Sequence, residues 1–368
     1  MIFPIILDVS KCNIPFIDEG VNINGISKES YCMDGDIIIA DASEDYNDIG
    51  KAIEISNVGV QKVVAGLHTI LARDKANVLA NKFRGFMMKS KVVHEQIRVL
   101  AVGSKVLGIS KTNLNKVNVH IPSIPEQHKI ADFLTAIDEK IENQKAIIEV
   151  FENQKKGFTQ KIFSKQLRFK NLNGNTFPDW EEKIITNIAK TSIGLVTTMT
   201  ENYVENGTKL IRNSDIKPNK IMQAGLINLD VNFAENNKNK EFQKFDIVTV
   251  HTGDIGVSAV IGDDMIGSLG FATLNTRPNL DIVNPYYLSL YYNSPKNIKY
   301  AITMSTGDGR SNYNLKDFDN AIIPIPSLPE QQKIANFLLS FENKIETEKQ
   351  NLTHWQTIKK GLLQQLFV

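Results

Sequence analysis

The sequence predicts an α/β (α+β) protein in which two mixed domains are separated by two long helices that pair as an antiparallel coiled coil. The first observation is an internal repeat: residues 121–163 return as residues 325–367 without a gap, and about 20 of the 43 aligned positions are identical. The second is a heptad pattern of apolar residues inside each copy. The third is a strand-rich stretch before each copy. A repeat of this length indicates two copies of one domain-plus-helix unit.

Length and composition are typical of a soluble two-domain protein. The 368 residues exceed one ordinary core, and 42% of them are hydrophobic and 23% charged. Cys12 and Cys32 are too few for a disulfide framework, and the start of the chain lacks a signal-peptide pattern, so we expect a cytoplasmic location. No apolar run reaches the about 18 residues of a membrane span. The net charge of +1 does not by itself indicate nucleic-acid binding.

The two copies of the repeat predict two spacer helices, within residues 119–170 and 323–368. Each copy has the pattern of a capping box, Ser123 to Glu126 and Ser327 to Glu330, with a proline in the first turn. A helix of about 40 residues is about 60 Å long. The apolar heptad positions form the expected helix-pair interface, which comprises Ile130, Leu134, Ile137, Ile141, Ile148, Phe151, Ile334, Leu338, Phe341, Ile345, Leu352 and Trp355.

Polar residues interrupt both heptad series at equal steps. Gln144 corresponds to Glu348, and Lys155 corresponds to Lys359. Because the two helices are always present together at high effective concentration, we expect them to pair with each other within one chain, and to run antiparallel. A homodimer, or packing of each helix on its neighbouring domain, are the alternatives.

The stretches before the helices, residues 1–118 and 171–322, are the two predicted mixed domains. Short β-branched runs alternate there with Gly, Asn and Asp clusters that are typical of turns. The two stretches match each other only loosely. The matches are residues 33–39 with 244–249, Gly50 with Gly256, and Asn113-Leu114 with Asn314-Leu315.

Three short strings resemble catalytic motifs but lack the context that those motifs need. Asn284-Pro-Tyr-Tyr287 has one proline fewer than the [DN]PPY motif of amino-methyltransferases, and no Gly-rich cofactor loop accompanies it. We expect Asn284 to cap a helix that has Pro285 at its first position. Residues 179–183 are too common a combination for a nuclease site, and residues 253–256 indicate a turn. The sequence therefore predicts a chain that is not an enzyme.

The array of motifs resembles that of the specificity subunits of type I restriction-modification systems. The resemblance rests on the duplicated helix start, Ile121 to Gln127 and Ile325 to Gln331, on the two Lys-Lys-Gly helix ends, and on Phe177-Pro-Asp-Trp-Glu-Glu-Lys183 where the second domain begins. It covers nearly the whole chain. The resemblance implies that each domain reads one half of a split sequence in double-stranded DNA and that the helices set the spacing.

The resemblance also implies partners. The helices would dock two modification subunits, which methylate adenine, and restriction subunits would join through these. The chain itself would bind no cofactor and no metal, since S-adenosylmethionine, ATP and Mg are expected on the partner subunits. No membrane partner is expected.

One departure from the family pattern concerns the first domain. It has no counterpart of residues 177–183 and begins near Leu7, so it is shorter by about 30 to 40 residues. A second hypothesis therefore stays open. The chain would be a scaffold that does not bind DNA, or a specificity subunit with one working half that forms a homodimer.

Candidate DNA-contacting residues lie in polar loops, because base edges are read by hydrogen-bond donors and acceptors, and phosphates by cations and hydroxyls. In the second domain they are Arg212, Asn213, Lys217, His251, Thr252 and, in a Gly-rich loop, Arg310, Ser311 and Asn312. In the first domain they are Ser10 and Lys11, taken as counterparts of Asn213 and Ser214, and Ser110 and Lys111, taken to lie in place of the Gly-rich loop. Solvated loops and a satisfied structural histidine are the alternatives. Arg277 is expected to be a surface residue.

Overall fold

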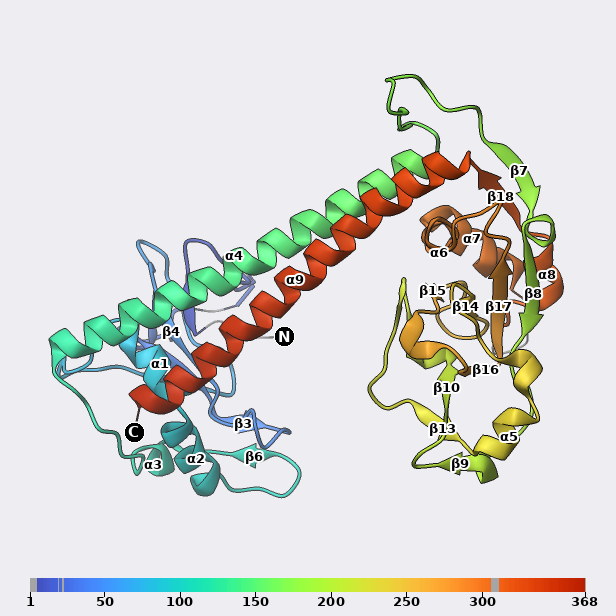
Figure 1. Ribbon diagram of the computed structural model, residues 1–368. Coiled ribbons are helices and arrows are strands. Elements are labelled where there is room, and N and C mark those ends of the chain that lie inside the picture. Colours follow the sequence, from blue (N-terminus) through green and yellow to red (C-terminus); the bar gives the residue numbers. More distant parts are fainter. Residues whose placement is uncertain (1–4, 19, 22, 306–310, 368) are drawn as a thin grey trace. The chain divides into compact units, whose positions relative to one another are not determined.

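The computed structural model describes residues 5–18, 20–21, 23–305 and 311–367. The chain forms two compact units: unit 1 holds Met1–Ile148 and Thr347–Val368, and unit 2 holds Glu149–Glu346. Both units mix strands and helices (Figure 1), which confirms the predicted fold class. The long helices α4 (Ile124–Phe163) and α9 (Leu328–Leu366) each contribute one half to each unit. No helix in the described ranges combines the length and the apolar character that crossing a membrane requires.

Unit 1 is built on a four-stranded sheet in the order β1-β4-β2-β5. β1 pairs parallel with β4, and the other two pairs are antiparallel. Residues from α1, α2 and both long helices share one apolar cluster. The strands and helices of the domain part are β1 (Ile6–Asp8), β2 (Ile37–Ala40), β3 (Ala42–Ser43), β4 (Ala52–Ser56), β5 (Thr69–Ala72), α1 (Phe83–Lys89), α2 (Lys91–Leu100), β6 (Leu107–Gly108) and α3 (Lys111–Leu114).

Unit 2 contains two four-stranded sheets, in the orders β15-β14-β17-β8 and β16-β10-β13-β9, and smaller two-stranded pairs. Its strands are β7 (Glu181–Ile184), β8 (Ala189–Ile193), β9 (Tyr203–Val204), β10 (Thr208–Arg212), β11 (Ile216–Lys217), β12 (Lys220–Ile221), β13 (Ile227–Leu229), β14 (Ile247–Val250), β15 (Ser258–Val260), β16 (Leu269–Phe271), β17 (Thr273–Pro278) and β18 (Ile322–Ile325). Its helices besides the long pair are α5 (Val231–Glu235), α6 (Pro285–Tyr292), α7 (Pro295–Met304) and α8 (Leu315–Asp319).

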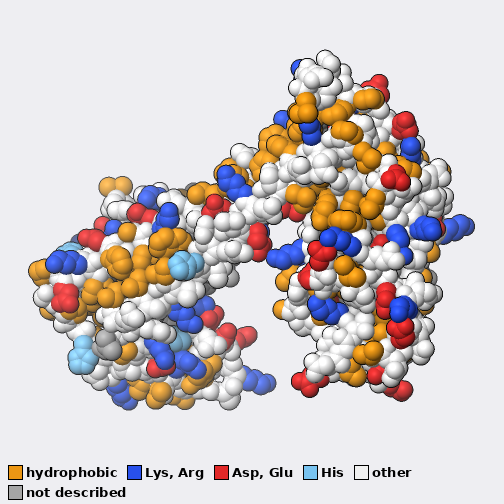
Figure 2. All heavy atoms as spheres, in the orientation of Figure 1, with side chains coloured by type: hydrophobic (Ala, Val, Ile, Leu, Met, Phe, Trp, Pro, Cys, Tyr) orange, Lys and Arg blue, Asp and Glu red, His pale blue; other side chains and the backbone are white. Residues whose placement is uncertain are grey.

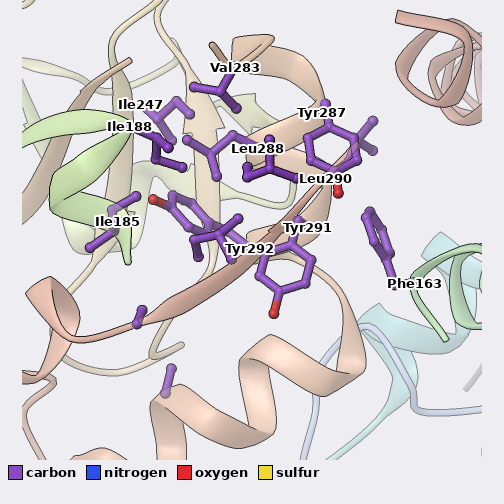
Figure 3. Close-up of a cluster of buried hydrophobic side chains, with 14 of the residues drawn as sticks. Phe163, Ile185, Ile188, Ile247, Val283, Tyr287, Leu288, Leu290, Tyr291 and Tyr292 are labelled. Carbon is purple, nitrogen blue, oxygen red and sulfur yellow. The ribbon is translucent and has the colours of Figure 1, made fainter. Parts of the chain in front are cut away.

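Helix α6 forms the centre of the unit 2 core (Figure 3). The Asn284 side chain accepts hydrogen bonds from the backbone N–H groups of Tyr286 and Tyr287, and Pro285 occupies the first turn, so the predicted helix start is confirmed. Tyr287 and Tyr291 pack with Phe163 from the end of α4, with ring centroids 5.8 and 5.3 Å apart. The string that resembles a methyltransferase motif is therefore a capped helix of the core.

The internal repeat extends upstream of the long helices with the same offset of 204 residues. The helices α1, α2 and α3 correspond in order to α6, α7 and α8, and Ser90 and Ser294 cap α2 and α7 at equivalent positions. Gly50 and Gly256 have positive φ angles of 72° and 83°. An added Cβ would lie 2.5 Å from Ile97 at Gly50 and 2.9 Å from Ala301 at Gly256, which are equivalent sites on α2 and α7. The predicted alignment of these two glycines is confirmed, although they lie 206 and not 204 residues apart, so the chain between glycine and helix is two residues shorter in unit 2.

An Asp–Arg ion pair links two neighbouring strands at the same place in the sheet of each unit. Asp36 precedes β2 and accepts two hydrogen bonds from Arg73, at 2.8 and 2.6 Å. Asp246 precedes β14 and accepts two from Arg277, at 2.9 and 2.7 Å. Both aspartates are buried. Arg277, predicted to be a surface residue, keeps 41% of its side chain exposed, while its guanidinium neutralises the buried carboxylate of Asp246 through two hydrogen bonds.

The helices α4 and α9 run antiparallel and pack side by side within each unit (Figure 1). In unit 1 the polar contacts are Gln144 with Glu348, Asp138 with Lys359, and Lys140 over the ring of Trp355. In unit 2 the contacts are Lys155 with Glu342, and Lys344 over the ring of Phe151. The last two repeat the Asp138–Lys359 and Lys140–Trp355 contacts at the offset of 204 residues. These two contacts are thus each made twice, whereas Gln144 meets its own counterpart Glu348.

The expected interface residues line this helix pair. Leu134, Ile137, Ile141 and Ile148 are buried in unit 1, where Ile130 also packs on the core, and Ile334, Leu338 and Ile345 are buried in unit 2. Phe341 packs against Phe158, with ring centroids 5.6 Å apart. The remaining expected residues, Phe151, Leu352 and Trp355, are half-buried.

A buried glutamine fastens the start of α4 to the domain of unit 1. Gln127 accepts a hydrogen bond from the backbone N–H of Ala80 at 2.7 Å. Its amide donates to the backbone carbonyls of Val78 and Pro122, at 3.0 and 2.9 Å. One buried side chain thus binds three backbone groups of two segments that are far apart in the sequence.

The second copy of this glutamine makes the same contacts in unit 2. Gln331 accepts from the backbone N–H of Asn284 at 2.8 Å and donates to the carbonyls of Ile282 and Pro326, at 3.0 and 2.8 Å. All three partners lie 204 residues after those of Gln127. The duplicated Pro-Glu-Gln sequence is therefore a structural joint between helix and domain.

The capping box predicted at the start of α9 is not formed. The Ser327 hydroxyl oxygen is buried without a hydrogen-bond partner. The carboxylate of Glu330 instead accepts from Trp180 Nε1 at 3.0 Å and from Arg168 Nε at 2.7 Å. The tertiary partners offer two donors, one of them charged, and outweigh the local backbone contact.

Replacing either joint glutamine should destabilise its own unit. Gln127→Ala and Gln331→Ala each leave three backbone groups without partners, and we expect the free energy of unfolding to fall by about 2 kcal/mol or more. Hydrogen exchange in urea measures each unit separately. The control is His128→Ala, an exposed neighbour that should change stability by less than about 0.5 kcal/mol. Equal small effects of all three variants would contradict the assigned role.

Candidate DNA interface

The structure brings together four of the predicted site residues of unit 2. The Asn213 carbonyl oxygen Oδ1 accepts from the backbone N–H of His251 at 2.9 Å. His251 Nδ1 lies 2.8 Å from Thr252 Oγ1, which donates to Asn312 Oδ1 at 2.6 Å. These residues come from the end of β10, the end of β14 and the segment before α8. We call Asn213, His251, Thr252 and Asn312 the polar cluster.

The local backbone explains why these segments meet. The Asn213 amide also donates to the carbonyl of Ala272, at 3.1 Å. Ala272 joins β16 to β17 and has a φ of 47°, in the left-handed region that costs a non-glycine residue free energy. Thr252 and Asn312 form an isolated antiparallel bridge. The Asn213 side chain thus uses both its amide nitrogen and its amide oxygen to hold the strand ends together. This makes Asn213 a positioning residue.

The polar cluster carries no charge at neutral pH. Burial lowers the pKa of His251 below its ordinary value, so the imidazole is neutral at pH 7. The Thr252 hydroxyl has one proton and donates it in the hydrogen bond to Asn312. Thr252 must therefore accept the hydrogen bond from His251 Nδ1–H. His251 Nε2 is then an acceptor, and no hydrogen bond to it is found within the described part of the chain. Such an acceptor matches the exocyclic amine of adenine or cytosine.

The surface beside the cluster is open. Thr252, Gly253, Ile255 and Ser311 line a shallow hollow. Gly253 has a φ of 98°, and an added Cβ would meet no atom within 4 Å. A glycine there lets the chain turn directly after β14 and keeps the surface low enough for a close approach. Arg310 lies outside the described residues.

Of the three cations predicted for this site, the two that lie among the described residues are paired with carboxylates. The Arg212 guanidinium donates to Asp215 at 2.9 and 2.8 Å, and these hydrogen bonds raise the pKa of Arg212. Lys217 Nζ lies 3.4 Å from Asp254, and both side chains are largely exposed. Lys217 can therefore exchange its partner for a phosphate at little cost, whereas Arg212 is held in the fold.

The predicted residues of unit 1 are placed differently. Ser10 donates to Asp8, and Lys11 Nζ lies 3.3 Å from the same carboxylate. The hydrogen bond from Ser10 lowers the pKa of Asp8 to about 2. They follow β1, which pairs with β4, whereas Asn213 follows β10, which pairs with β13 and β16. The predicted equivalence of Ser10-Lys11 with Asn213-Ser214 is therefore not supported by the strand pairing.

Ser110 and Lys111 lie at the start of α3. Ser110 caps this helix and accepts from the backbone N–H of Asn113 at 3.1 Å, and its counterpart in unit 2 is Asn314, the cap of α8. The predicted match of Asn113 with Asn314 was therefore three residues out of register. Residues 101–109 are the true counterparts of 305–313, and they expose Ser104 and Lys105 beside Gly103. Extending the constant offset of 204 upstream of the helix repeat would have found them.

Charges of both signs share the surface around these sites. On the face shown in Figure 2, Lys and Arg side chains alternate with Asp and Glu over both units. Among the residues that the structure describes, no group of three or more His, Cys, Asp and Glu side chains is placed to hold a metal ion.

Comparison with known proteins places the chain in a family. Residues 10–153 and 178–354 match the type I restriction modification DNA specificity domain. The chain belongs to this family, the specificity subunits of type I restriction-modification systems, which are the non-catalytic DNA-recognition components of these enzymes. The resemblance inferred from the sequence is confirmed.

Individual relatives agree with this assignment. The type I restriction enzyme EcoBI specificity subunit of Escherichia coli is 24% identical over 281 residues, which cover 70% of this chain and 59% of that protein. The crystal structure of the S subunit from M. genitalium has a TM-score of 0.57 at 17% identity and covers 99% of this chain and 88% of that chain. A chain from a study of complex assembly and conformational transition of the type I R-M system has a TM-score of 0.58 at 15% identity, covering 90% and 81%. The two structures show a shared fold.

The hydrogen-bond chain of the polar cluster can be tested by NMR. We expect His251 to titrate below the free-peptide midpoint of about 6.5 and to carry its proton on Nδ1 at pH 7. Imidazole ¹⁵N shifts report both properties. Thr252→Val removes the acceptor and should release the ring from this tautomer. A proton on Nε2 in the unmodified chain would contradict the assignment.

Proposed function

We propose that the chain is the DNA-recognition subunit of a type I restriction-modification complex and that it reads a bipartite sequence in double-stranded DNA. The observation that carries the proposal is the neutral polar cluster of unit 2, in which the histidine keeps an acceptor nitrogen without a partner among the described residues, next to a shallow hollow. Hydrogen-bonding groups without charge are suited to base edges, while phosphate binding needs cations. The repeated scaffold of unit 1 would read the second half of the sequence.

The chemistry would take place on other subunits. Modification subunits docked on the paired helices would flip an adenine into their own pocket and methylate it. They would hold S-adenosylmethionine, and restriction subunits with ATP and Mg would join through them. This chain would hold no cofactor and would fix only where on the DNA the others act.

A half-functional subunit is the second candidate. It is favoured by a difference between the units: the candidate residues Ser10 and Lys11 of unit 1 follow a strand with different pairing from the one before Asn213. In that case two copies would form a homodimer and read the DNA with unit 2 alone, or the chain would be a scaffold that leaves DNA unbound.

Mapping methylated adenines separates these functions. We expect co-expression with a cognate modification subunit to give methylation at a bipartite, asymmetric motif, and the purified chain alone to transfer no methyl group. A palindromic motif would favour the homodimer that uses unit 2 only. Methyl transfer by the isolated chain, or no sequence-specific methylation in the complex, would reject the proposed function.

Substitutions of His251 and Lys217 should change DNA affinity in different ways, and the salt dependence of binding distinguishes them. His251→Ala should weaken binding to the mapped duplex by about 1–3 kcal/mol and leave binding to unrelated DNA unchanged, because it removes a base contact. Lys217→Ala should weaken both and lower the slope of log K against log salt by about 1. Fluorescence anisotropy over a salt series measures both effects, and Glu139→Ala on α4 is the control. Equal loss on both duplexes with His251→Ala would exclude base recognition by this residue.

A further inference from the structure

The end of β2 in unit 1 has the same backbone surroundings as the end of β14 in unit 2, where the polar cluster lies. β2 pairs with β5 as β14 pairs with β17, and the last residue pair of each ladder directly precedes Asp41 or His251. The backbone carbonyl of Asp41 accepts from the N–H of Ile109 at 2.8 Å, and that of His251 accepts from Tyr313 at 3.0 Å. Ile109 and Tyr313 lie 204 residues apart. Asp41 is therefore the counterpart of His251.

The residue pair that follows this position is also equivalent in the two units. In unit 1 Ala42 of β3 pairs with Gly108 of β6 (Figure 1), and in unit 2 Thr252 pairs with Asn312. The hydroxyl and the amide that bond to each other in the polar cluster thus correspond to a methyl group and to a hydrogen atom. Asp41 therefore occupies the position of His251 without the neighbouring side chains that engage the histidine.

A residue in the left-handed region supports this position in both units. His68 has a φ of 57°, and Ala272, which lies 204 residues later, has a φ of 47°. In unit 1 the backbone N–H of Asp41 donates directly to the carbonyl of His68, at 3.1 Å. In unit 2 the Asn213 side chain bridges the equivalent groups, the N–H of His251 and the carbonyl of Ala272. Unit 1 thus builds the same backbone arrangement without a residue in the role of Asn213.

The Asp41 carboxylate has an oxygen without a hydrogen-bond donor. Oδ1 is buried and accepts no hydrogen bond within the described part of the chain. His68 Nδ1 lies 3.7 Å from it, beyond hydrogen-bond distance. The Asp41 side chain is 33% exposed, and rotation of the carboxylate about its Cβ–Cγ bond brings either oxygen towards the surface. A buried oxygen without a donor costs free energy, and a donor on a ligand would recover it.

A carboxylate at a DNA surface is unsuited to phosphates and suited to particular bases. In the major groove it accepts from the exocyclic amines N4 of cytosine and N6 of adenine, whereas guanine and thymine present the acceptors O6 and O4 at the corresponding edge. The exposed His68 ring beside Asp41 has an N–H donor in either tautomer, which suits O6 of the guanine paired with cytosine, or N7 of adenine. Both units thus present an acceptor for an amine from the same backbone position.

We propose that Asp41, with the His68 ring beside it, reads a base that carries an exocyclic amine, cytosine or adenine, in the half of the DNA site that unit 1 binds. The inference rests on the proposed function and adds to it a recognition residue and the kind of base. An aspartate with a purely structural role is bonded within the fold, as Asp36 is to Arg73 and Asp246 is to Arg277. Asp41 has no such donor among the described residues.

The test uses the complex of the full chain with its cognate modification subunit, and duplexes that carry the mapped motif. Each cytosine of the motif is replaced in turn by 2-pyrimidinone, and each adenine except the methylated one by purine; both analogues lack only the exocyclic amine. We expect one replacement to weaken binding to the unmodified complex at least about tenfold and to have no further effect with Asp41→Ala. The analogue that behaves in this way distinguishes cytosine from adenine.

Two further variants serve as controls. Glu44→Ala removes an exposed carboxylate three residues further along, so it changes the net charge equally and should keep the full sensitivity to the analogue. His68→Ala introduces the residue that unit 2 has at this backbone angle; it should weaken binding to the motif and keep the sensitivity to the amine. Unchanged hydrogen exchange in β2 and β5 verifies that Asp41→Ala keeps its fold. Asp41→Ala and Glu44→Ala should bind unrelated DNA at least as tightly as the unmodified chain, because each removes a negative charge.

Two results would overturn this inference and leave the proposed function intact. The first is a bipartite motif at which the losses caused by Asp41→Ala and by every amine replacement simply add. The second is sensitivity to the amine that disappears with His68→Ala and persists with Asp41→Ala. A palindromic motif read by unit 2 alone would overturn the inference as well. The absence of any sequence-specific methylation by the unmodified complex is a separate outcome, which rejects the proposed function itself.

Discussion

Antiparallel pairing of two copies of one helix sequence is the constraint on which the rest of the structure depends. When the copies pair in opposite directions, each side-chain contact must occur twice, once in each unit. The Asp138–Lys359 pair in unit 1 and the Glu342–Lys155 pair in unit 2 are two versions of one contact. A polar residue in the interface between α4 and α9 is then compatible with stable pairing only if its partner residue is also duplicated. The exception is Gln144, which meets its own counterpart Glu348, and the amide–carboxylate pair there avoids the repulsion of two glutamates.

The helix pair is connected to the domains by buried polar side chains that satisfy backbone groups. Gln127 and Gln331 each join the helix start to a loop before α1 or α6. The Asp36–Arg73 and Asp246–Arg277 pairs hold the sheet in the same way in both units. A buried side chain that bonds two or three groups at fixed positions tolerates little variation in its surroundings. Such joints keep the scaffolds of the two units alike.

The residues proposed for recognition differ from the joints in position and in bonding. Asn213, His251, Thr252 and Asn312 lie at chain turns where three segments of unit 2 meet, and their mutual hydrogen bonds determine which atoms remain for a ligand. The cations Arg212 and Lys217 contribute less than their charges suggest, since carboxylates of the same unit pair with both. A near-neutral chain can in this way present specific hydrogen-bonding groups without a strongly basic surface.

The sequence alone determined the repeat, the helix pair with its heptad residues, the cap of α6 and the family, because these depend on periodicity and on local spacing. It also pointed to the residues of the polar cluster by type. The tertiary structure decided what these side chains do: Glu330 binds Trp180 and Arg168 where a capping box was predicted, Arg277 neutralises a buried aspartate, and Ser10 follows a strand unlike the one before Asn213. The physical reason is that a polar side chain takes the best donor or acceptor within reach. Which groups lie within reach is fixed by contacts between residues that are far apart along the chain.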